Sequence, residues 1–214
     1  MTDGELSALA ARALAAAGDG AQARVLHERR VRPGELRERT VVELAFARDG
    51  LVGWARTTDV SDAGLAAAAA AATAASSGDQ RSGFPGWPAP AAGRPHEGWD
   101  PVAARLEPGA LPGGVAEARA SRVAITSSTG IAVTERRSRV VGVEGVPVLP
   151  VPLIQDGVAH RVFHDTRSAA LAGAGAVSTG HAGRPGGAAE GPRPRNLVLV
   201  GGRRRRGRAD RGGR

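Results

Sequence analysis

Glycine and proline limit where this chain can form helices and strands. The 214 residues include 31 glycines and 14 prolines, together about a fifth of the chain, so much of it must be loop or linker. Residues 76–95 read SSGDQRSGFPGWPAPAAGRP, a composition that prevents regular secondary structure. We therefore expect one folded unit before this segment and another after it.

Residues 1–77 have the pattern of a small α+β unit. Apolar side chains recur at helical spacing near the N-terminus, and Ser61 is the expected N-cap of an alanine-rich helix. Asp49-Gly50 predicts a tight hairpin between two alternating stretches, and Arg32-Pro33-Gly34 predicts a turn. The expected elements are helices at 3–17 and 63–75 and strands at 23–28, 40–48 and 51–57.

The sequence after the linker favours strands, because short apolar stretches alternate with turn residues. The expected elements are hairpins at 122–136 and 153–163, an irregular strand at 140–151, a short helix at 166–174 and a last strand at 196–200. The prediction is an α+β fold, in which an N-terminal helix-strand-hairpin-helix unit precedes a mostly β C-terminal part.

The expected division of the chain has five parts. They are an N-terminal α+β domain at 1–77, a Pro/Gly-rich linker at 78–98, the remnant of a central segment at 99–139, a β-rich C-terminal domain fragment at 140–200 and a basic disordered tail at 201–214. The C-terminal fragment has strands but almost no helix to cover them, and uncovered apolar faces favour association. We expect this part to be marginally stable alone, so that the chain aggregates or needs a partner subunit.

Positive charge is concentrated in the tail. The formal net charge is +8, and residues 203–214 hold seven Arg and one Asp. Such a cluster binds phosphate backbones non-specifically by counterion release, but a solvated end is the more common case, and we favour it. Aromatic residues make up only 3% of the chain, too few for a surface that stacks nucleic-acid bases.

Cysteine content and hydropathy exclude several protein classes. The chain has no cysteine, which excludes disulfides, thiolate metal sites and a cysteine nucleophile. The longest apolar stretch surrounds Ala66–Ala72 and is far too short for a membrane span. The acidic start of the chain, with Arg inside the apolar run, is unlike a signal peptide. We expect a cytoplasmic protein.

No group of residues has the spacing of a catalytic or metal site. His96-Glu97 lacks the second histidine of a zinc-binding helix, and His160 and His164 lie in a stretch that alternates like a strand. Ser178-Thr179-Gly180-His181 places hydroxyls beside a histidine, but neighbours in sequence do not form a triad. Spacing pairs none of three isolated aspartates, Asp100, Asp156 and Asp165. We predict no catalytic, cofactor-binding or metal-binding residue and no cofactor.

The order of several short segments is more informative than any one of them. EGVP at 144–147 precedes PLIQDGVAHRVFHDT at 152–166, VSTGHA at 177–182 and PRNLVL at 194–199. These segments resemble the late part of the TldD/PmbA family of metallopeptidases. Trp99-Asp100-Pro101 and residues 123–130 resemble its central segment, and residues 46–59 with the following helix resemble its first domain.

The resemblance implies a role in proteolysis without metal chemistry. Catalytic members carry a His-Glu-x-x-x-His helix and a distant cysteine for one zinc ion, and this chain has neither. It is therefore similar to the non-catalytic PmbA (TldE) type. The expected partners are a TldD-type catalytic subunit or further copies of this chain, and the peptide substrate of the complex, with no membrane. The alternative function is a basic accessory protein that binds nucleic acid weakly through its tail.

Two departures from the family predict a fragment. Between Arg139 and Val140 the family has a stretch on the order of a whole domain, which is absent here. After Val200 the sequence becomes GGRRRRGRADRGGR, unlike the family. We expect a truncated or internally deleted member without activity of its own.

Overall fold

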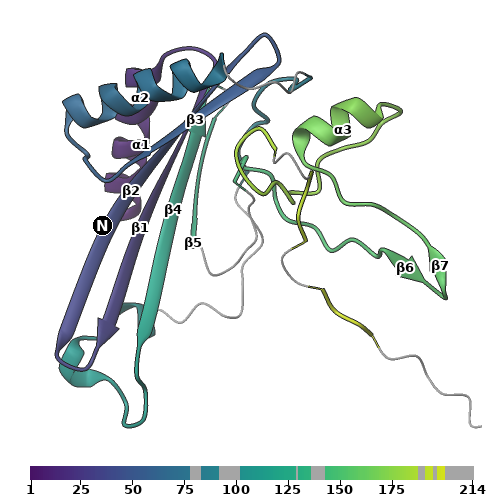
Figure 1. Ribbon diagram of the computed structural model, residues 1–214. Coiled ribbons are helices and arrows are strands. Elements are labelled where there is room, and N and C mark those ends of the chain that lie inside the picture. The colour runs from purple at the N-terminus through teal and green to yellow at the C-terminus, as the bar shows by residue number, and fades with distance from the viewer. Residues whose placement is uncertain are drawn as a thin grey trace, which may run out of the picture.

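A five-stranded antiparallel sheet with two helices on one face forms the larger part of the molecule (Figure 1). The computed structural model describes residues 1–77, 83–91, 102–128, 130–135, 143–187, 191–194 and 197–200. The strand order is β3-β2-β1-β4-β5, and β6 and β7 form a separate two-stranded hairpin. The predicted α+β class is confirmed.

The elements have the following bounds. The N-terminal ones are α1 (Asp3–Ala17), β1 (Ala21–Arg32), β2 (Glu35–Arg48), β3 (Leu51–Thr57) and α2 (Asp62–Ser76). The later ones are the 3₁₀ turns η1 (Ala103–Arg105) and η2 (Pro108–Ala110), the strands β4 (Ala118–Ser127), β5 (Gly130–Glu135), β6 (Ile154–Gln155) and β7 (Val158–Ala159), and helix α3 (Thr166–Ala172).

Local sequence explains the ends of the two long helices. Thr2 caps α1 in a capping box with Glu5, because each side chain accepts a hydrogen bond from the other residue's backbone N–H. Ser61 caps α2 by accepting from the backbone N–H of Gly64. The predicted turn at Asp49-Gly50 connects β2 to β3, with both residues at positive φ.

The first hairpin is longer than the alternation of apolar residues predicts. β1 and β2 pair from Ala21 opposite Phe46 to Arg32 opposite Glu35, next to the predicted turn at Pro33-Gly34. The extra length consists mainly of charged residues, which a search for apolar alternation does not count. Cross-strand ion pairs such as that between Arg39 and Glu28 accompany the pairing there.

The main core lies between the sheet and the two helices. Leu6 of α1 and Leu65 of α2 are at most 1% exposed, and they pack with Val25, Val42 and Leu44 of the sheet. Gly53 lets α2 approach closely, since a Cβ on it would lie 1.9 Å from the backbone oxygen of Ala72. These contacts stabilise the fold by burial of apolar surface.

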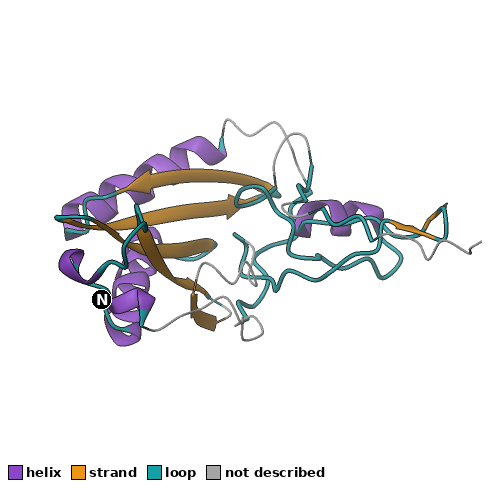
Figure 2. Cartoon of the chain, turned by 90° about the horizontal axis from the view of Figure 1, so that it is seen from below, coloured by secondary structure: helices purple, strands orange, loops and turns teal. Residues whose placement is uncertain are grey.

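The other face of the sheet is covered by loops (Figure 2). Residues 83–91 contain no helix or strand, yet Phe84 is 5% exposed and packs with Ala45 and Val52. The indole Nε1 of Trp87 donates to the backbone oxygen of Gly20 at 2.8 Å. Most of β1 from Ala21 to His27 is therefore buried on both faces, which explains the weak alternation of its sequence.

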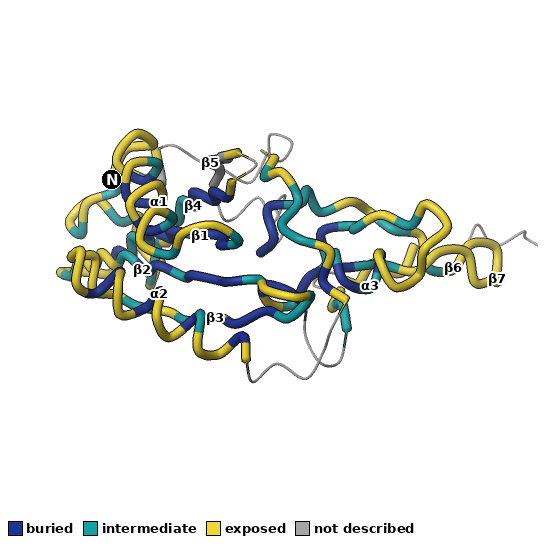
Figure 3. The backbone as a smooth tube through the Cα atoms, turned by 90° about the horizontal axis from the view of Figure 1, so that it is seen from above, coloured by how far each residue is buried: buried dark blue, intermediate teal, exposed yellow. Residues whose placement is uncertain are grey.

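The C-terminal part is mostly loop, with the short helix α3 and the hairpin β6–β7. Figure 3 shows that the hairpin is exposed, and Ile154 and Val158 are 72% and 67% exposed. The second strand predicted at 153–163 ends at Ala159, and residues 197–200 form no strand although one was predicted at 196–200. Local apolar sequence alone does not make a strand without a paired neighbour. None of the helices in the described part of the chain has the length and apolarity to span a membrane.

Candidate functional site

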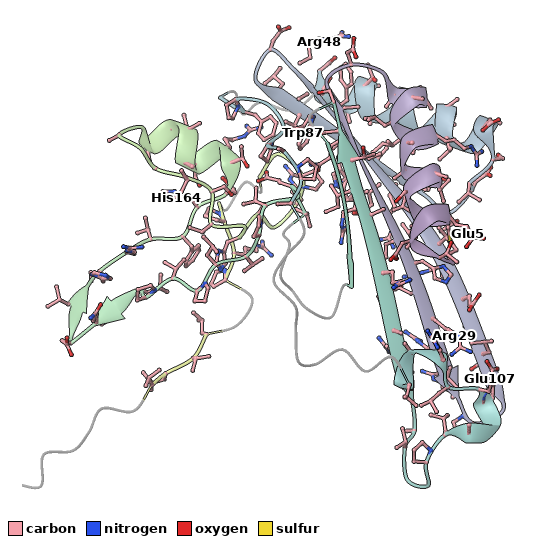
Figure 4. The ribbon with its side chains drawn as sticks, turned by 180° about the vertical axis from the view of Figure 1, so that it is seen from behind. Glu5, Arg29, Arg48, Trp87, Glu107 and His164 are labelled. Carbon is pink, nitrogen blue, oxygen red and sulfur yellow. The ribbon has the colours of Figure 1, made fainter. Side chains whose placement is uncertain are left out.

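Three of the segments that carry the family resemblance meet in one polar cluster, formed by Glu144, Asp165, Thr166, Thr179 and His181. The backbone N–H of Leu149 donates to the oxygen of Thr179 at 3.1 Å, and that of Thr179 donates to the oxygen of His164 at 3.0 Å. A Cβ on Gly180 would lie 2.5 Å from the backbone oxygen of Pro147, so only glycine fits there. Figure 4 shows His164 beside α3, apart from the five-stranded sheet.

Glu144 is the most unusual residue of this cluster, because this acidic residue is only 1% exposed. Its Oε2 accepts hydrogen bonds from the N–H and the hydroxyl of Thr166 at 3.1 and 2.7 Å. Its Oε1 has no hydrogen-bond partner within the described residues. Burial raises the pKa of Glu144 to about 7, and the charge of Asp165 acts in the same direction.

Glu144 also ties the cluster to the sheet. The side chain of Gln22, 2% exposed on β1, donates through Nε2 to the backbone oxygen of Glu144 at 3.0 Å. A Cβ on Gly145 would come within 3.0 Å of Pro90. Glu144 therefore lies where the C-terminal loops dock on the face of the sheet opposite the helices.

Asp165 has a structural role as the N-cap of α3. Its Oδ1 accepts from the backbone N–H of Ser168 at 2.7 Å, and the Ser168 hydroxyl accepts from the backbone N–H of Asp165 at 3.0 Å. A Cβ on Gly187 would lie 2.8 Å from Oδ2 of Asp165, which keeps this position small. Asp-x-x-Ser is a capping pattern that could have been found in the sequence.

Thr179 and His181 contact each other, and the same hydroxyl also binds the backbone of His164. Thr179 Oγ1 lies 2.9 Å from Nδ1 of His181, accepts from the backbone N–H of His164 at 2.9 Å, and lies 3.0 Å from the backbone oxygen of His164. Which of Oγ1 and Nδ1 donates depends on the tautomer of His181, and the same hydroxyl is also held by the backbone of His164. This geometry fixes the loop 177–182 against the start of α3, as expected for a structural link.

The other candidate residues from the sequence are scattered. His160 is exposed, and Nδ1 of His164 lies 3.4 Å from the hydroxyl of Ser168. Asp156 lies in the turn between β6 and β7 with φ of 52°. His96-Glu97 and Asp100 lie outside the described residues. Within the described ranges, no three His, Asp or Glu side chains are placed to share a metal ion.

Comparison with known proteins finds one family model that matches the C-terminal part of the chain. Residues 120–208 match the family model described as the PmbA/TldA metallopeptidase C-terminal domain. No curated protein matches the chain.

Among solved structures, the chain is similar to TldE from Thermococcus kodakarensis, with 13% identity, a TM-score of 0.42, and coverage of 62% of this chain and 36% of that one. A proposed modulator of DNA gyrase from Bacteroides thetaiotaomicron has 16% identity and a TM-score of 0.40, with coverage of 63% and 39%. The chain thus spans little more than a third of the length of these proteins. The match at 120–208 includes the segments that form the polar cluster, and it supports a relationship between this part of the chain and the TldD/PmbA metallopeptidase family.

Proposed function

We propose that this chain is a cytoplasmic TldD/PmbA-type subunit that has no metal chemistry of its own and pairs with a zinc-bearing catalytic subunit in the proteolysis of unfolded peptides. The observation that supports this is the match of residues 120–208 to a metallopeptidase C-terminal domain in a chain without cysteine. The two His-Glu pairs, at His27 and His96, are followed five positions after the histidine by Arg32 and Pro101. Neither pair therefore provides the second histidine that a zinc site of the family type requires.

The alternative function, nucleic-acid binding through the basic tail, rests on residues 203–214, which lie outside the described residues. Its only support is the charge of that segment. We therefore favour the role as a peptidase subunit.

The test combines metal analysis with a pairing assay. We expect the purified chain to contain no stoichiometric zinc and to hydrolyse no unfolded peptide, and we expect it to co-purify with a tagged TldD-type subunit but not with an unrelated tagged enzyme. Stoichiometric zinc with chelator-sensitive hydrolysis by the chain alone would contradict the non-catalytic role. Failure to co-purify would contradict the pairing.

A further inference from the structure

A cavity of about 400 Å³ lies on the helix face of the sheet, far from the polar cluster. His27 and Arg29 of β1, Glu38 of β2 and Arg122 of β4 line it, and Arg105 and Glu107 from the segment around η1 and η2 complete it. Figure 4 shows Arg29 and Glu107 together at this end of the sheet, below the end of α1 that carries Glu5. The volume lies in the range of small-molecule sites.

Arg29 fixes one wall of the cavity and neutralises its acidic groups. Its guanidinium lies 3.3 Å from the carboxylate of Glu38 and 2.8 Å from that of Glu107. It also donates to the backbone oxygens of Leu106 and Ala104. With its side chain only 15% exposed, Arg29 is fully engaged by the protein and is not available to a ligand.

Two further groups in the cavity contribute little free charge. Arg122 is 2.9 Å from the carboxylate of Asp3. His27 is 9% exposed, and its Nδ1 lies 3.1 Å from the hydroxyl of Thr40. Burial, followed by the positive α-amino group, lowers the pKa of His27 below its usual value, which favours the neutral form of the ring.

Arg105 differs from Arg29 and Arg122, because its guanidinium forms no hydrogen bond or ion pair with any described residue. It is exposed and lines the cavity from η1. The nearby small side chains of Ala104 and Ala120 leave an apolar wall. Among the described residues, the cavity thus offers the guanidinium of Arg105 without an ion-pair partner, the α-amino group of Met1, the imidazole of His27 and an apolar wall.

We propose that this cavity binds a small carboxylate with an aliphatic body, with Arg105 as its cation. A guanidinium matches a carboxylate with two parallel hydrogen bonds. The apolar wall of Ala104 and Ala120 suits a carboxylate with an aliphatic body better than inorganic phosphate, which has no apolar part. The carboxylate is either the C-terminus of a short peptide or a free aliphatic acid, and these two sources share the same contacts.

The test is calorimetric titration of the full chain with four probes: acetyl-Ala-Ala, its C-terminal amide, butyrate and inorganic phosphate. We expect saturable binding of at least one carboxylate, and about tenfold weaker binding of the amide, because the amide lacks the charge-assisted hydrogen bonds. Binding of acetyl-Ala-Ala in preference to butyrate identifies a peptide C-terminus as the source, and the reverse identifies a free acid. Equal affinity for acid and amide, or tighter binding of phosphate than of either carboxylate, would overturn the proposal.

Two variants locate the site. Arg105→Gln should weaken carboxylate binding about tenfold, whereas Arg161→Gln, at an exposed arginine of the C-terminal loops, should leave it unchanged. Ala120→Leu should reduce binding by filling the cavity without altering its charge. Unchanged affinity in the Arg105 variant would show that the ligand binds elsewhere. Since the Arg105 guanidinium has no partner among the described residues, its replacement should leave the circular dichroism spectrum and the melting temperature unchanged.

Discussion

At the scale of single residues, Glu144 couples folding to pH. Its ordinary pKa of 4.5 is raised to about 7 by burial. Between these values the folded chain holds a proton that the unfolded chain has released, so the stabilisation from this group is fully present below about pH 4.5 and is lost as the pH rises through about 7. Above that pH, the folded state must keep a buried carboxylate, one oxygen of which has no hydrogen-bond partner among the described residues.

We predict that Glu144→Gln removes this pH dependence. The amide resembles the protonated acid, so the variant should gain about 3 kcal/mol over the wild type at about pH 8 and almost nothing at about pH 4. Urea denaturation followed by tryptophan fluorescence at both pH values would measure this. Asp19→Asn, at an exposed carboxylate, should keep the wild-type dependence. A Glu144 variant with the same pH profile as the wild type would contradict the assignment.

At the scale of elements, the β1–β2 hairpin contains an ion pair inside the sheet. Arg24 and Glu43 are directly opposite each other, and their side chains are 12% and 13% exposed. They face away from the helices, between Gln22 and Leu26 along β1. A pair this buried has lost much of its hydration, so each buried charge is stabilised mainly by its partner.

A double-mutant cycle should reveal this dependence. We expect Glu43→Leu to destabilise the fold by about 3 kcal/mol, because it leaves Arg24 buried without its carboxylate, whereas Arg24→Met/Glu43→Leu should lie within about 1 kcal/mol of the wild type. The exposed pair of Arg37 and Glu35 provides the control, since Arg37→Ala should cost less than about 0.5 kcal/mol. Additive single effects from urea denaturation would refute the coupling.

At the scale of the whole molecule, the sheet unites segments that are far apart in the chain. β4 pairs with β1 along ten residues, and Ala124 lies in the core beneath the helices. Residues 143–187 contact the face of the sheet opposite the two helices at a few positions. One of them is Gly186, where a Cβ would lie 2.6 Å from the side chain of Val52. The far end of this segment, with Ile154, Val158 and Val162 exposed by 67% or more, makes no comparable contacts among the described residues.

Hydrogen exchange should distinguish the protected sheet from the exposed C-terminal hairpin. We predict slow exchange in β1 at residues 22–27 and fast exchange across 148–163 in a dilute monomeric sample, because protection follows burial and sheet pairing. If the exposed hairpin associates, protection of 148–163 should rise with protein concentration while that of β1 stays constant. Uniformly slow exchange across 148–163 at low concentration would show that this part forms its own core.

Some elements were predictable because their signals are local. The caps at Thr2 and Ser61, the helical spacing of α1 and α2 and the turn at Asp49-Gly50 act within a few residues. The strand predicted at 196–200 is absent at 197–200, because apolar sequence does not specify a partner strand. The polar cluster was not predicted, although Glu144 is the only acidic residue among the valines of 140–151.

The sequence by itself determined the α+β class, the N-terminal helices and hairpin, the lack of thiolate chemistry and the family resemblance. Only the tertiary structure decided that β1 is central, that residues 83–91 cover the sheet, and that Glu144 is buried beside Thr166. The physical reason is range: caps, turns and periodicity are properties of neighbouring residues, whereas strand pairing and burial depend on which distant segments meet. The raised pKa of Glu144 arises from such a meeting, and no local pattern around residue 144 predicts it.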